Sequence, residues 1–368
     1  MTTLITGATG GIGASLVGRL ASADHAVRAG SRDPRKAAGL GAEIVELDLA
    51  KSETFGEALA DVDRIFLYAE PAAIEDFVDC AERAGVRRVV LLSSDSVELS
   101  NAEHNALAQH HADVEKALAA ASFSTTVLRP GTFATMTLDW ATFIRAGVPV
   151  EQPCWDACID VIHPEDIADA AECALTGDDL EGLVLPLGGP EVLSFHQQRD
   201  TLASLLAREL DWREPSRERA VQHLSRHAPL PLVDGILDYW SQLLRHHGEA
   251  RRHGEARRSV VRITGRPGRA FRQWAGERLV RSAARRGCRP VHLGSHGRPL
   301  ICRGSPAMGR RHPGRGSAKR RVQQNDADRC PPRVRQHCLA LRRHPSRRLP
   351  TVRRQMAAES STVAPQVR

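Results

Sequence analysis

Short apolar runs alternate with longer amphipathic stretches along the first part of the chain. The runs are bounded by turn residues and predict β-strands, whereas apolar residues three and four positions apart predict helices. The strands are expected at 4–5, 26–29, 44–47, 64–68, 88–92 and 125–128. The helices between them are expected at 12–23, 52–60, 71–84 and 103–121. This alternation predicts an α/β fold, a doubly wound parallel sheet of the Rossmann type.

A smaller α/β subdomain is expected on the substrate side. It begins with a predicted helix at 164–176 and a strand and turn at 183–190, and three further helices follow at 195–209, 216–228 and 231–244. We therefore divide this part of the chain into a nucleotide-binding core, 1–150, and a substrate-side subdomain, 151–244, interleaved with it. Trp212, Tyr239 and Trp240 either line an apolar cleft or fill a small core, and we expect the second.

Charge separates the chain into two unequal parts. Residues 1–244 hold 19 Lys and Arg against 38 Asp and Glu, whereas residues 245–368 hold 32 against 6. Residues 282–368 are rich in Arg, Gly and Pro and contain no aromatic side chain, so we expect no compact fold there. This tail is either an arm that binds nucleic acid or the product of a shifted reading frame. We favour the second, with the frame lost near 245, recovered near 260 and lost again after about 280, so that 245–281 is protein-like only in part.

Composition also excludes several classes of protein. No run approaches the roughly eighteen apolar residues that a membrane span needs, so we expect no membrane association. The N-terminus shows no signal-peptide pattern, which predicts a cytoplasmic protein. The eight cysteines are scattered without a Cys-x-x-Cys pair, so reduced thiols are expected rather than disulfides or a metal site.

A glycine-rich turn follows the first predicted strand and opens the first predicted helix. Its spacing is Gly-x-x-Gly-x-x-Gly, which lets the backbone approach a pyrophosphate while the helix N-terminus supplies free N–H groups. The position after an N-terminal strand indicates a dinucleotide site rather than a purely structural turn. The residues expected to contact the cofactor here are Gly7, Thr9, Gly10, Gly11, Ile12 and Gly13.

The end of the second strand selects the nucleotide. Ser31 and Arg32 can donate to a 2′-phosphate, with Lys36 as a further cation, which favours NADP(H) over NAD(H). Asp33 would oppose a 2′-phosphate, but it precedes Pro34 and is placed to cap a helix. After the third strand, Asp48-Leu49 suits the adenine edge, although an aspartate there can equally cap the next helix.

The ordered motifs of residues 1–244 resemble those of NmrA-like atypical short-chain dehydrogenases. Besides the glycine turn, the matching segments are Ser31-Arg32-Asp33-Pro34, Ala84-Gly85-Val86-Arg87-Arg88-Val89-Val90, Leu128-Arg129-Pro130-Gly131 and Asp160-Val161-Ile162-His163-Pro164-Glu165-Asp166-Ile167-Ala168. The resemblance implies that the loop holding Pro130, Gly131 and Phe133 closes beside the nicotinamide, although a rigid turn is the alternative. Members include NADPH-dependent quinone reductases, tailoring enzymes of secondary metabolism, and regulators that bind NADP without turnover.

Candidate catalytic residues differ from those of ordinary short-chain dehydrogenases. Neither tyrosine is followed by Lys at the Tyr-x-x-x-Lys spacing that supplies the usual proton donor. On the corresponding helix, His111 and Glu115 resemble the His-x-x-x-Glu of NmrA-like quinone reductases and share a helix face. Ser93 and Ser94 follow the fifth strand, at the sheet edge where ligands bind. We take His111 and Ser93 as the catalytic candidates, with a solvated helix and a capping turn as the alternatives.

Together these features predict an NADPH-dependent reductase that transfers hydride to a quinone-like or aromatic small molecule. Such acceptors need little acid catalysis, which fits the missing Tyr/Lys pair. Two alternatives stay open, a non-catalytic sensor of NADP that binds a protein partner and a tailoring enzyme of aromatic natural-product biosynthesis. A homodimer is possible in either case.

Overall fold

The computed structural model describes residues 1–245 and 259–285. The expectations for residues 246–258 and 286–368 fall outside this range. The boundary expected at 282 lies within the last turn of α12 (Phe271–Arg285).

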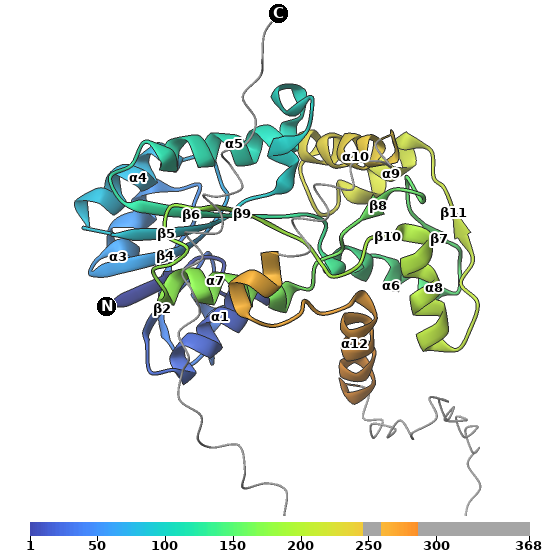
Figure 1. Cartoon of the computed structure of the whole chain (residues 1–368), viewed down its shortest axis with the longest axis horizontal. Helices are drawn as coiled ribbons and strands as arrows, with labels where there is room; N and C mark the ends of the chain where they lie inside the picture. Colours follow the sequence, from blue (N-terminus) through green and yellow to red (C-terminus); the bar gives the residue numbers. More distant parts are fainter. Residues whose placement is uncertain (246–258, 286–368) are drawn as a thin grey trace, which may run out of the picture. The chain divides into compact units, whose positions relative to one another are not determined.

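A seven-stranded sheet confirms the predicted α/β fold (Figure 1). Every neighbouring pair of its strands is parallel. The strands, in their order across the sheet, are β3 (Glu43–Glu46), β2 (Ala26–Ser31), β1 (Thr2–Ile5), β4 (Val62–Tyr68), β5 (Arg88–Leu92), β6 (Ser124–Pro130) and β9 (Val184–Leu187). The chain runs outward from β1 in one direction and from β4 in the other, so the loops after β1 and β4 diverge and leave a crevice at the carboxyl edge.

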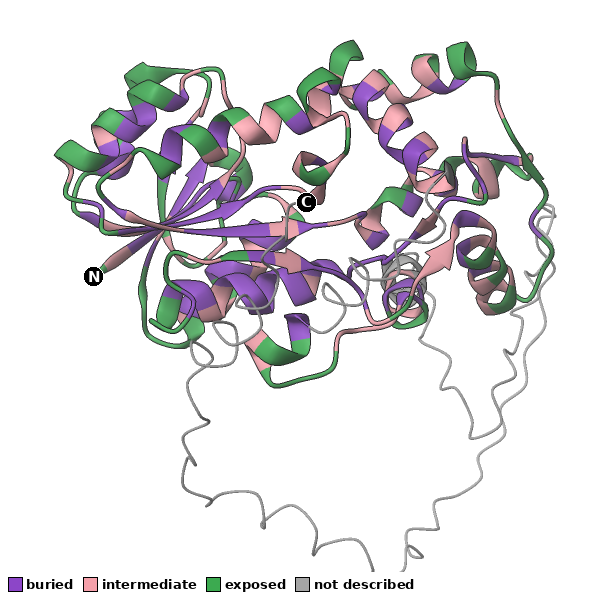
Figure 2. Ribbon diagram, turned by 45° about the horizontal axis from the view of Figure 1, so that its top comes forward, coloured by how far each residue is buried: buried purple, intermediate pink, exposed green. Residues whose placement is uncertain are grey.

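Helices cover both faces of the sheet (Figure 1). One face packs against α1 (Gly11–Ser22) and α7 (Pro164–Thr176), through a core that includes Leu16 and Ile167. The other face packs against α3 (Phe55–Leu59), α4 (Ile74–Arg83) and α5 (Ala106–Ala119). Figure 2 shows the central strands of the main sheet buried along most of their length, and all five residues of β5 are buried. Burial on both faces explains the apolar runs within these central strands.

The substrate-side subdomain differs in two respects from the expectation. The helix expected at 164–176, α7, packs against the main sheet, and the strand expected there, β9, pairs in parallel with β6 and completes that sheet. The subdomain itself holds two two-stranded sheets and several helices around an aromatic core. Its elements are α6 (Trp140–Ala146), β7 (Val150–Glu151), β8 (Cys158–Ile159), β10 (Leu193–Ser194), α8 (Phe195–Leu206), β11 (Trp212–Arg213), α9 (Arg217–Leu224) and α10 (Leu230–Arg245).

Residues 259–285 belong to this fold. Phe271 and Trp274 are buried in the aromatic core of the subdomain, and Val260 joins the core under α1 and α7. Arg269 forms ion pairs with Asp166 and Asp169 of α7. The segment that we expected to be protein-like, from about residue 260, therefore packs against both the aromatic core of the subdomain and the core under α1 and α7.

Short helical turns complete the chain between the larger elements. They are α2 (Pro34–Ala37), η1 (Ser52–Thr54), η2 (Asp95–Glu98), η3 (Ala102–His104) and η4 (Ala134–Leu138). The turns α2, η2 and η4 follow β2, β5 and β6, so they lie at the carboxyl edge of the sheet where the crevice opens.

Candidate active site

A groove of about 440 Å³ runs along the carboxyl edge of the sheet, across the loops after β1, β2, β3 and β4. Eight of the predicted cofactor residues line it: Gly7, Thr9, Gly10, Ser31, Arg32, Lys36, Asp48 and Leu49. Ile12 does not line the groove, because its side chain is 5% exposed and packs in the core under α1. The glycine turn and the end of β2 thus meet in one groove, as the sequence predicted.

The N-terminus of α1 is shaped for an anion. Its N-cap, Gly10, makes no side-chain cap, and no acidic residue lies in the first turn, so the N–H groups there are not competed for by a neighbouring carboxylate. Gly7 has a φ of +58°. A Cβ on Gly13 would lie 2.4 Å from the Gly7 carbonyl oxygen, whereas one on Gly11 would meet nothing within 4 Å. The close approach of α1 to the glycine turn therefore depends on Gly13. The glycine turn and the N-terminus of α1 together form a cradle that fits a pyrophosphate.

At the end of β2, two cations are placed for a 2′-phosphate. Arg32 and Lys36 are exposed on the groove wall. Asp33 also lines the groove, and its carboxylate accepts from the backbone N–H of Arg35 and pairs with the Arg35 side chain at 2.9 Å. Arg35 holds the pKa of Asp33 below its usual range. The capping role expected for Asp33 is what the geometry shows.

Two other predicted groove residues also make local contacts. The Ser31 hydroxyl donates to the carbonyl of Asp33 at 3.0 Å and accepts from its N–H, so it shapes the turn. Asp48 accepts from the Ala50 N–H at 3.2 Å and pairs with Lys51 at 3.5 Å. Both residues line the groove, and their position there depends on these turns.

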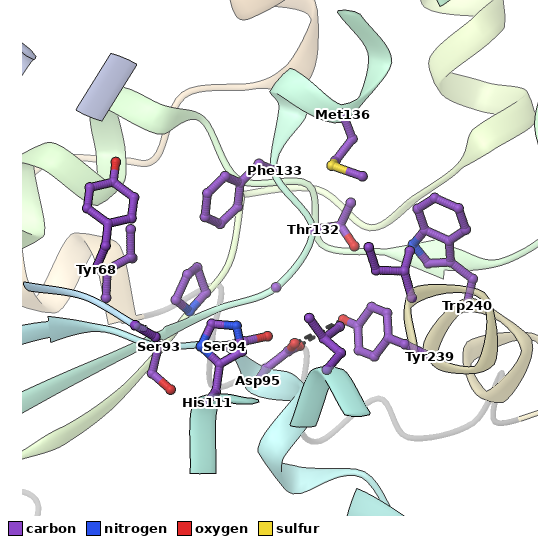
Figure 3. A pocket seen from close by; sticks show the side chains of 16 residues that line it. Tyr68, Ser93, Ser94, Asp95, His111, Thr132, Phe133, Met136, Tyr239 and Trp240 are labelled. Atoms are coloured by element: carbon purple, nitrogen blue, oxygen red, sulfur yellow. Dashed lines mark hydrogen bonds between the residues drawn. The ribbon is translucent and has the colours of Figure 1, made fainter. Parts of the chain in front are cut away.

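A second cavity, of about 290 Å³, adjoins the groove, and Tyr68 and Ala69 line both (Figure 3). The predicted residues Ser93, His111, Pro130, Gly131 and Phe133 line this cavity. Its wall is mainly apolar and includes Leu92, Leu107, Met136, Ile236 and Trp240. An apolar chamber beside a dinucleotide groove is a suitable place for an acceptor molecule.

His111 presents a neutral imidazole to this cavity. Burial, and to a lesser degree the neighbouring His110, lowers the pKa of His111 to about 4. Its Nδ1 is buried and has no hydrogen-bond partner within the described part of the chain. At neutral pH the ring is therefore equipped to hydrogen-bond a polar atom of a ligand and not to deliver a proton from an imidazolium.

Ser93 and Glu115 form a contact that the sequence did not predict. The Ser93 hydroxyl donates to Glu115 at 2.5 Å, and Figure 3 shows it directed away from the other labelled side chains. Glu115 also forms an ion pair with Arg129, which in turn contacts Glu98 at 3.1 Å. His111 and Glu115 therefore do not act at the same place. His111 lines the cavity, whereas Glu115 does not line it and instead joins α5 to β6 through Arg129.

Asp95 is a cavity residue that the sequence analysis missed, and Tyr239 is one for which it favoured a position in the core over the cleft. The Tyr239 hydroxyl donates to both carboxylate oxygens of Asp95 at 3.0 Å (Figure 3). Burial, together with Asp95 and Asp160, raises the pKa of Tyr239 well above its ordinary value. The expectation that Tyr239 and Trp240 only fill a core is wrong, because both also line the cavity.

A close helix crossing brings Tyr239 to the cavity. Asn105 caps α5 by accepting from the Ala108 N–H, and its amide donates to the Gly235 carbonyl of α10 at 3.0 Å. A Cβ on Gly235 would lie 2.7 Å from the Leu107 backbone nitrogen. The crossing thus requires a glycine on α10, and the only sequence signal for it is an isolated glycine inside an apolar helix.

Gly131 has a comparable reason to be glycine. A Cβ there would lie 2.9 Å from an Asp160 carboxylate oxygen and 3.2 Å from one of Asp95. The loop after β6 therefore passes between the carboxylates of Asp95 and Asp160. A side chain at position 131 would push these carboxylates away.

Within residues 1–245 and 259–285, no cluster of His, Cys, Asp and Glu could hold a metal ion. Over the same residues, no helix combines the length and apolar character needed to cross a membrane. Cys80, Cys154, Cys158 and Cys173 form no disulfide among the described residues.

Comparison with known proteins places these features in a family. The profile of the NAD(P)H-binding family matches residues 7–170. The chain is 34% identical over 283 residues to the (4-alkanoyl-5-oxo-2,5-dihydrofuran-3-yl)methyl phosphate reductase of Streptomyces griseus, covering 74% of this chain and 96% of that protein. It is 29% identical over 282 residues to the uncharacterized oxidoreductase YesF of Bacillus subtilis, covering 74% and 93%.

Solved structures share the fold. The NADPH-dependent quinone oxidoreductase of Escherichia coli in complex with NADPH superposes with a TM-score of 0.63 at 22% identity, over 75% of this chain and 99% of that one. The triphenylmethane reductase of Citrobacter sp. in complex with NADP(H) has a TM-score of 0.63 at 18% identity, over 76% and 99%.

Proposed function

This chain belongs to the NAD(P)H-binding, NmrA-like family of atypical short-chain dehydrogenases and reductases, and on that premise we propose that it is an NADPH-dependent reductase of conjugated, quinone-like or aromatic small molecules. The observation that carries the proposal is the apolar cavity that shares Tyr68 and Ala69 with the dinucleotide groove. An acceptor in that cavity lies next to the cofactor site, at the sheet edge where this fold binds its ligands.

The groove residues fit NADPH. The N-terminus of α1 would hold the pyrophosphate, and Arg32 and Lys36 would hold the 2′-phosphate, which favours NADPH over NADH. The loop of Pro130, Gly131 and Phe133 would close on the nicotinamide side. Bound NADPH supplies the hydride, and the protein supplies position, an apolar environment and the hydrogen bond from or to His111.

The cavity favours acceptors that need no strong acid. His111 is neutral at neutral pH because burial lowers its pKa to about 4, and the Tyr239 phenol has a raised pKa and donates to Asp95. Ser93 donates to Glu115. Tyr68 also lines the cavity, but burial raises the pKa of its phenol to about 12, which makes it a weak acid. A saturated ketone needs a proton on its oxygen as hydride arrives, whereas a conjugated acceptor delocalises the charge. The names of the relatives support the same class, since they specify an oxo-dihydrofuran, a quinone and a triphenylmethane compound.

A turnover assay tests the proposal. Purified full-length protein would be mixed with NADPH and, in separate reactions, a benzoquinone, an α,β-unsaturated lactone and a saturated ketone of similar size. We expect NADPH oxidation with the conjugated acceptors and none with the ketone. Tight NADPH binding without oxidation by any acceptor would contradict the reductase and support the non-catalytic sensor.

The catalytic role of His111 is tested by His111→Ala, which should lower turnover and leave NADPH affinity at the wild-type value. A matched control is His104→Ala, since His104 lies in η3 with a largely exposed side chain and does not line the cavity. Equal effects of the two substitutions would remove His111 from the site.

A further inference from the structure

Tyr68 lies where the two halves of the site meet. It is the last residue of β4 and lines both the dinucleotide groove and the acceptor cavity. Its ring packs over the glycine turn, since a Cβ on Gly7 would lie 2.8 Å from two ring carbons. The edge of the ring also contacts Phe66, with ring centroids 5.5 Å apart. These contacts fix the direction of the phenol.

The Tyr68 oxygen reaches the N-terminus of α1. It lies near the backbone N–H of Gly13, the third residue of the helix, and this N–H opposes in part the effect of burial on the pKa of the phenol. The N–H groups of a first turn have no acceptor within the helix, and Gly10 supplies no side-chain cap. The Tyr68 oxygen therefore lies beside uncapped N–H groups of α1. A Cβ on Gly10 would lie 3.7 Å from the Tyr68 oxygen, so this oxygen lies beside the cradle.

The phenol also carries a proton. Burial raises the pKa of Tyr68 to about 12, so the group is neutral at physiological pH. Among the hydrogen bonds formed within residues 1–245 and 259–285, none takes this proton. The hydroxyl thus has a proton left to donate next to the place where a pyrophosphate would lie.

We propose that Tyr68 is a cofactor-positioning residue, whose hydroxyl lies beside the N-terminus of α1 and donates to a pyrophosphate oxygen of bound NAD(P)H. The proposal rests on the NAD(P)H site of the proposed function and not on turnover. Tyr68 belongs to both the groove and the cavity wall. Binding of the pyrophosphate would therefore also hold this part of the cavity wall in place.

Tyr68→Phe tests the hydroxyl alone. Binding would be titrated by calorimetry with NADPH and with adenosine 2′-monophosphate, which keeps the 2′-phosphate and lacks the pyrophosphate. Because a hydrogen bond to a charged oxygen is lost, NADPH should bind about tenfold or more weakly. Adenosine 2′-monophosphate should bind as it does to the wild type. Unchanged NADPH affinity overturns the proposal, and equal weakening for both ligands overturns it too, because Tyr68 would then only support the loop.

Tyr239→Phe is the matched control. Tyr239 is the other of the 2 tyrosines in the chain, and it lines the cavity but not the groove. This substitution should leave the affinity for both ligands unchanged.

The same control variant provides a second measurement in case Tyr68→Phe folds poorly. In Tyr239→Phe protein labelled with fluorotyrosine, Tyr68 is the single fluorine site. Its NMR signal should move on addition of NADP⁺ and stay in place with adenosine 2′-monophosphate. An unchanged fluorine signal on addition of NADP⁺, while calorimetry shows that NADP⁺ binds, contradicts the proposed role of Tyr68. Absence of NADPH binding to wild-type protein would instead refute the proposed function itself.

Discussion

The dinucleotide groove and the acceptor cavity adjoin one another but are built in different ways. The groove takes its residues from between Thr6 and Glu70, and each group directly follows a strand. The cavity takes its residues from between Tyr68 and Trp240, and they reach it from five separate parts of the chain. A groove of local loops depends on backbone shape, whereas a cavity of distant segments depends on how helices pack. Damage to local backbone should therefore affect cofactor binding first, and damage to packing should affect the cavity first.

The largest effect is expected from Gly13→Val. The added side chain would begin 2.4 Å from the Gly7 carbonyl oxygen, so α1 cannot keep its place against the glycine turn. NADPH binding, measured by titration, should be lost. Gly11→Ala is the control, because its Cβ meets nothing within 4 Å, and it should keep wild-type affinity. Wild-type affinity in Gly13→Val would show that the groove does not depend on this approach.

Next in size is Trp274→Ala, which acts on packing. Trp274 is 2% exposed in the aromatic core that also contains Trp240 of the cavity wall. Removing a buried Trp should lower the free energy of unfolding by about 3–5 kcal/mol, measured by urea denaturation. The acceptor KM should rise more than the NADPH Kd. Gln273→Ala serves as control, because the Gln273 side chain is exposed. If Trp274→Ala is as stable as this control, residues 259–285 do not contribute to the stability of the fold.

Arg32→Ala is expected to act on the groove alone. Loss of a charge-assisted contact to the 2′-phosphate should cost about 1.5–3 kcal/mol of NADPH binding and leave NADH nearly unaffected. Calorimetry with both cofactors measures the difference. Arg83→Ala is the matched control, because Arg83 is exposed in the last turn of α4 and does not line the groove. Equal losses for both cofactors would remove the NADPH assignment.

The smallest effect is a pH dependence that originates in the cavity. Burial lowers the pKa of His111 from 6.5 to about 4 in the folded chain, so the unfolded chain binds more protons between these values. Stability is therefore full above pH 6.5 and is lost as the pH falls toward 4, by roughly 1 kcal/mol between about pH 7 and pH 5.5. Urea denaturation of wild type and His111→Gln should show that the variant loses less over this interval. Parallel losses in the two proteins would contradict the buried neutral imidazole.

Much of the main sheet followed from the sequence because its signals are local. The strand expected at 26–29 is β2 (Ala26–Ser31), and the one expected at 64–68 is β4 (Val62–Tyr68). Apolar runs of this length, buried on both faces, are visible without knowing their partners. The two-residue strands β7, β8, β10 and β11 were not found, because two residues show no periodicity. The strand near 184–187 was found but placed in the subdomain, since its partner β6 lies far back in the chain.

By itself, the sequence determined the α/β fold, the glycine turn and the cations at the end of β2, because backbone conformation and charge at those positions depend on adjacent residues. Only the tertiary structure decided the acceptor cavity. It turned Ser93 toward Glu115, left the Nδ1 of His111 buried without a hydrogen-bond partner among the described residues, and brought Tyr239 to Asp95. These contacts join residues 22 and 144 positions apart. Side chains so far apart meet only through tertiary packing. The crossing of α10, which carries Tyr239, on α5 is set by packing around Gly235, which no local pattern encodes.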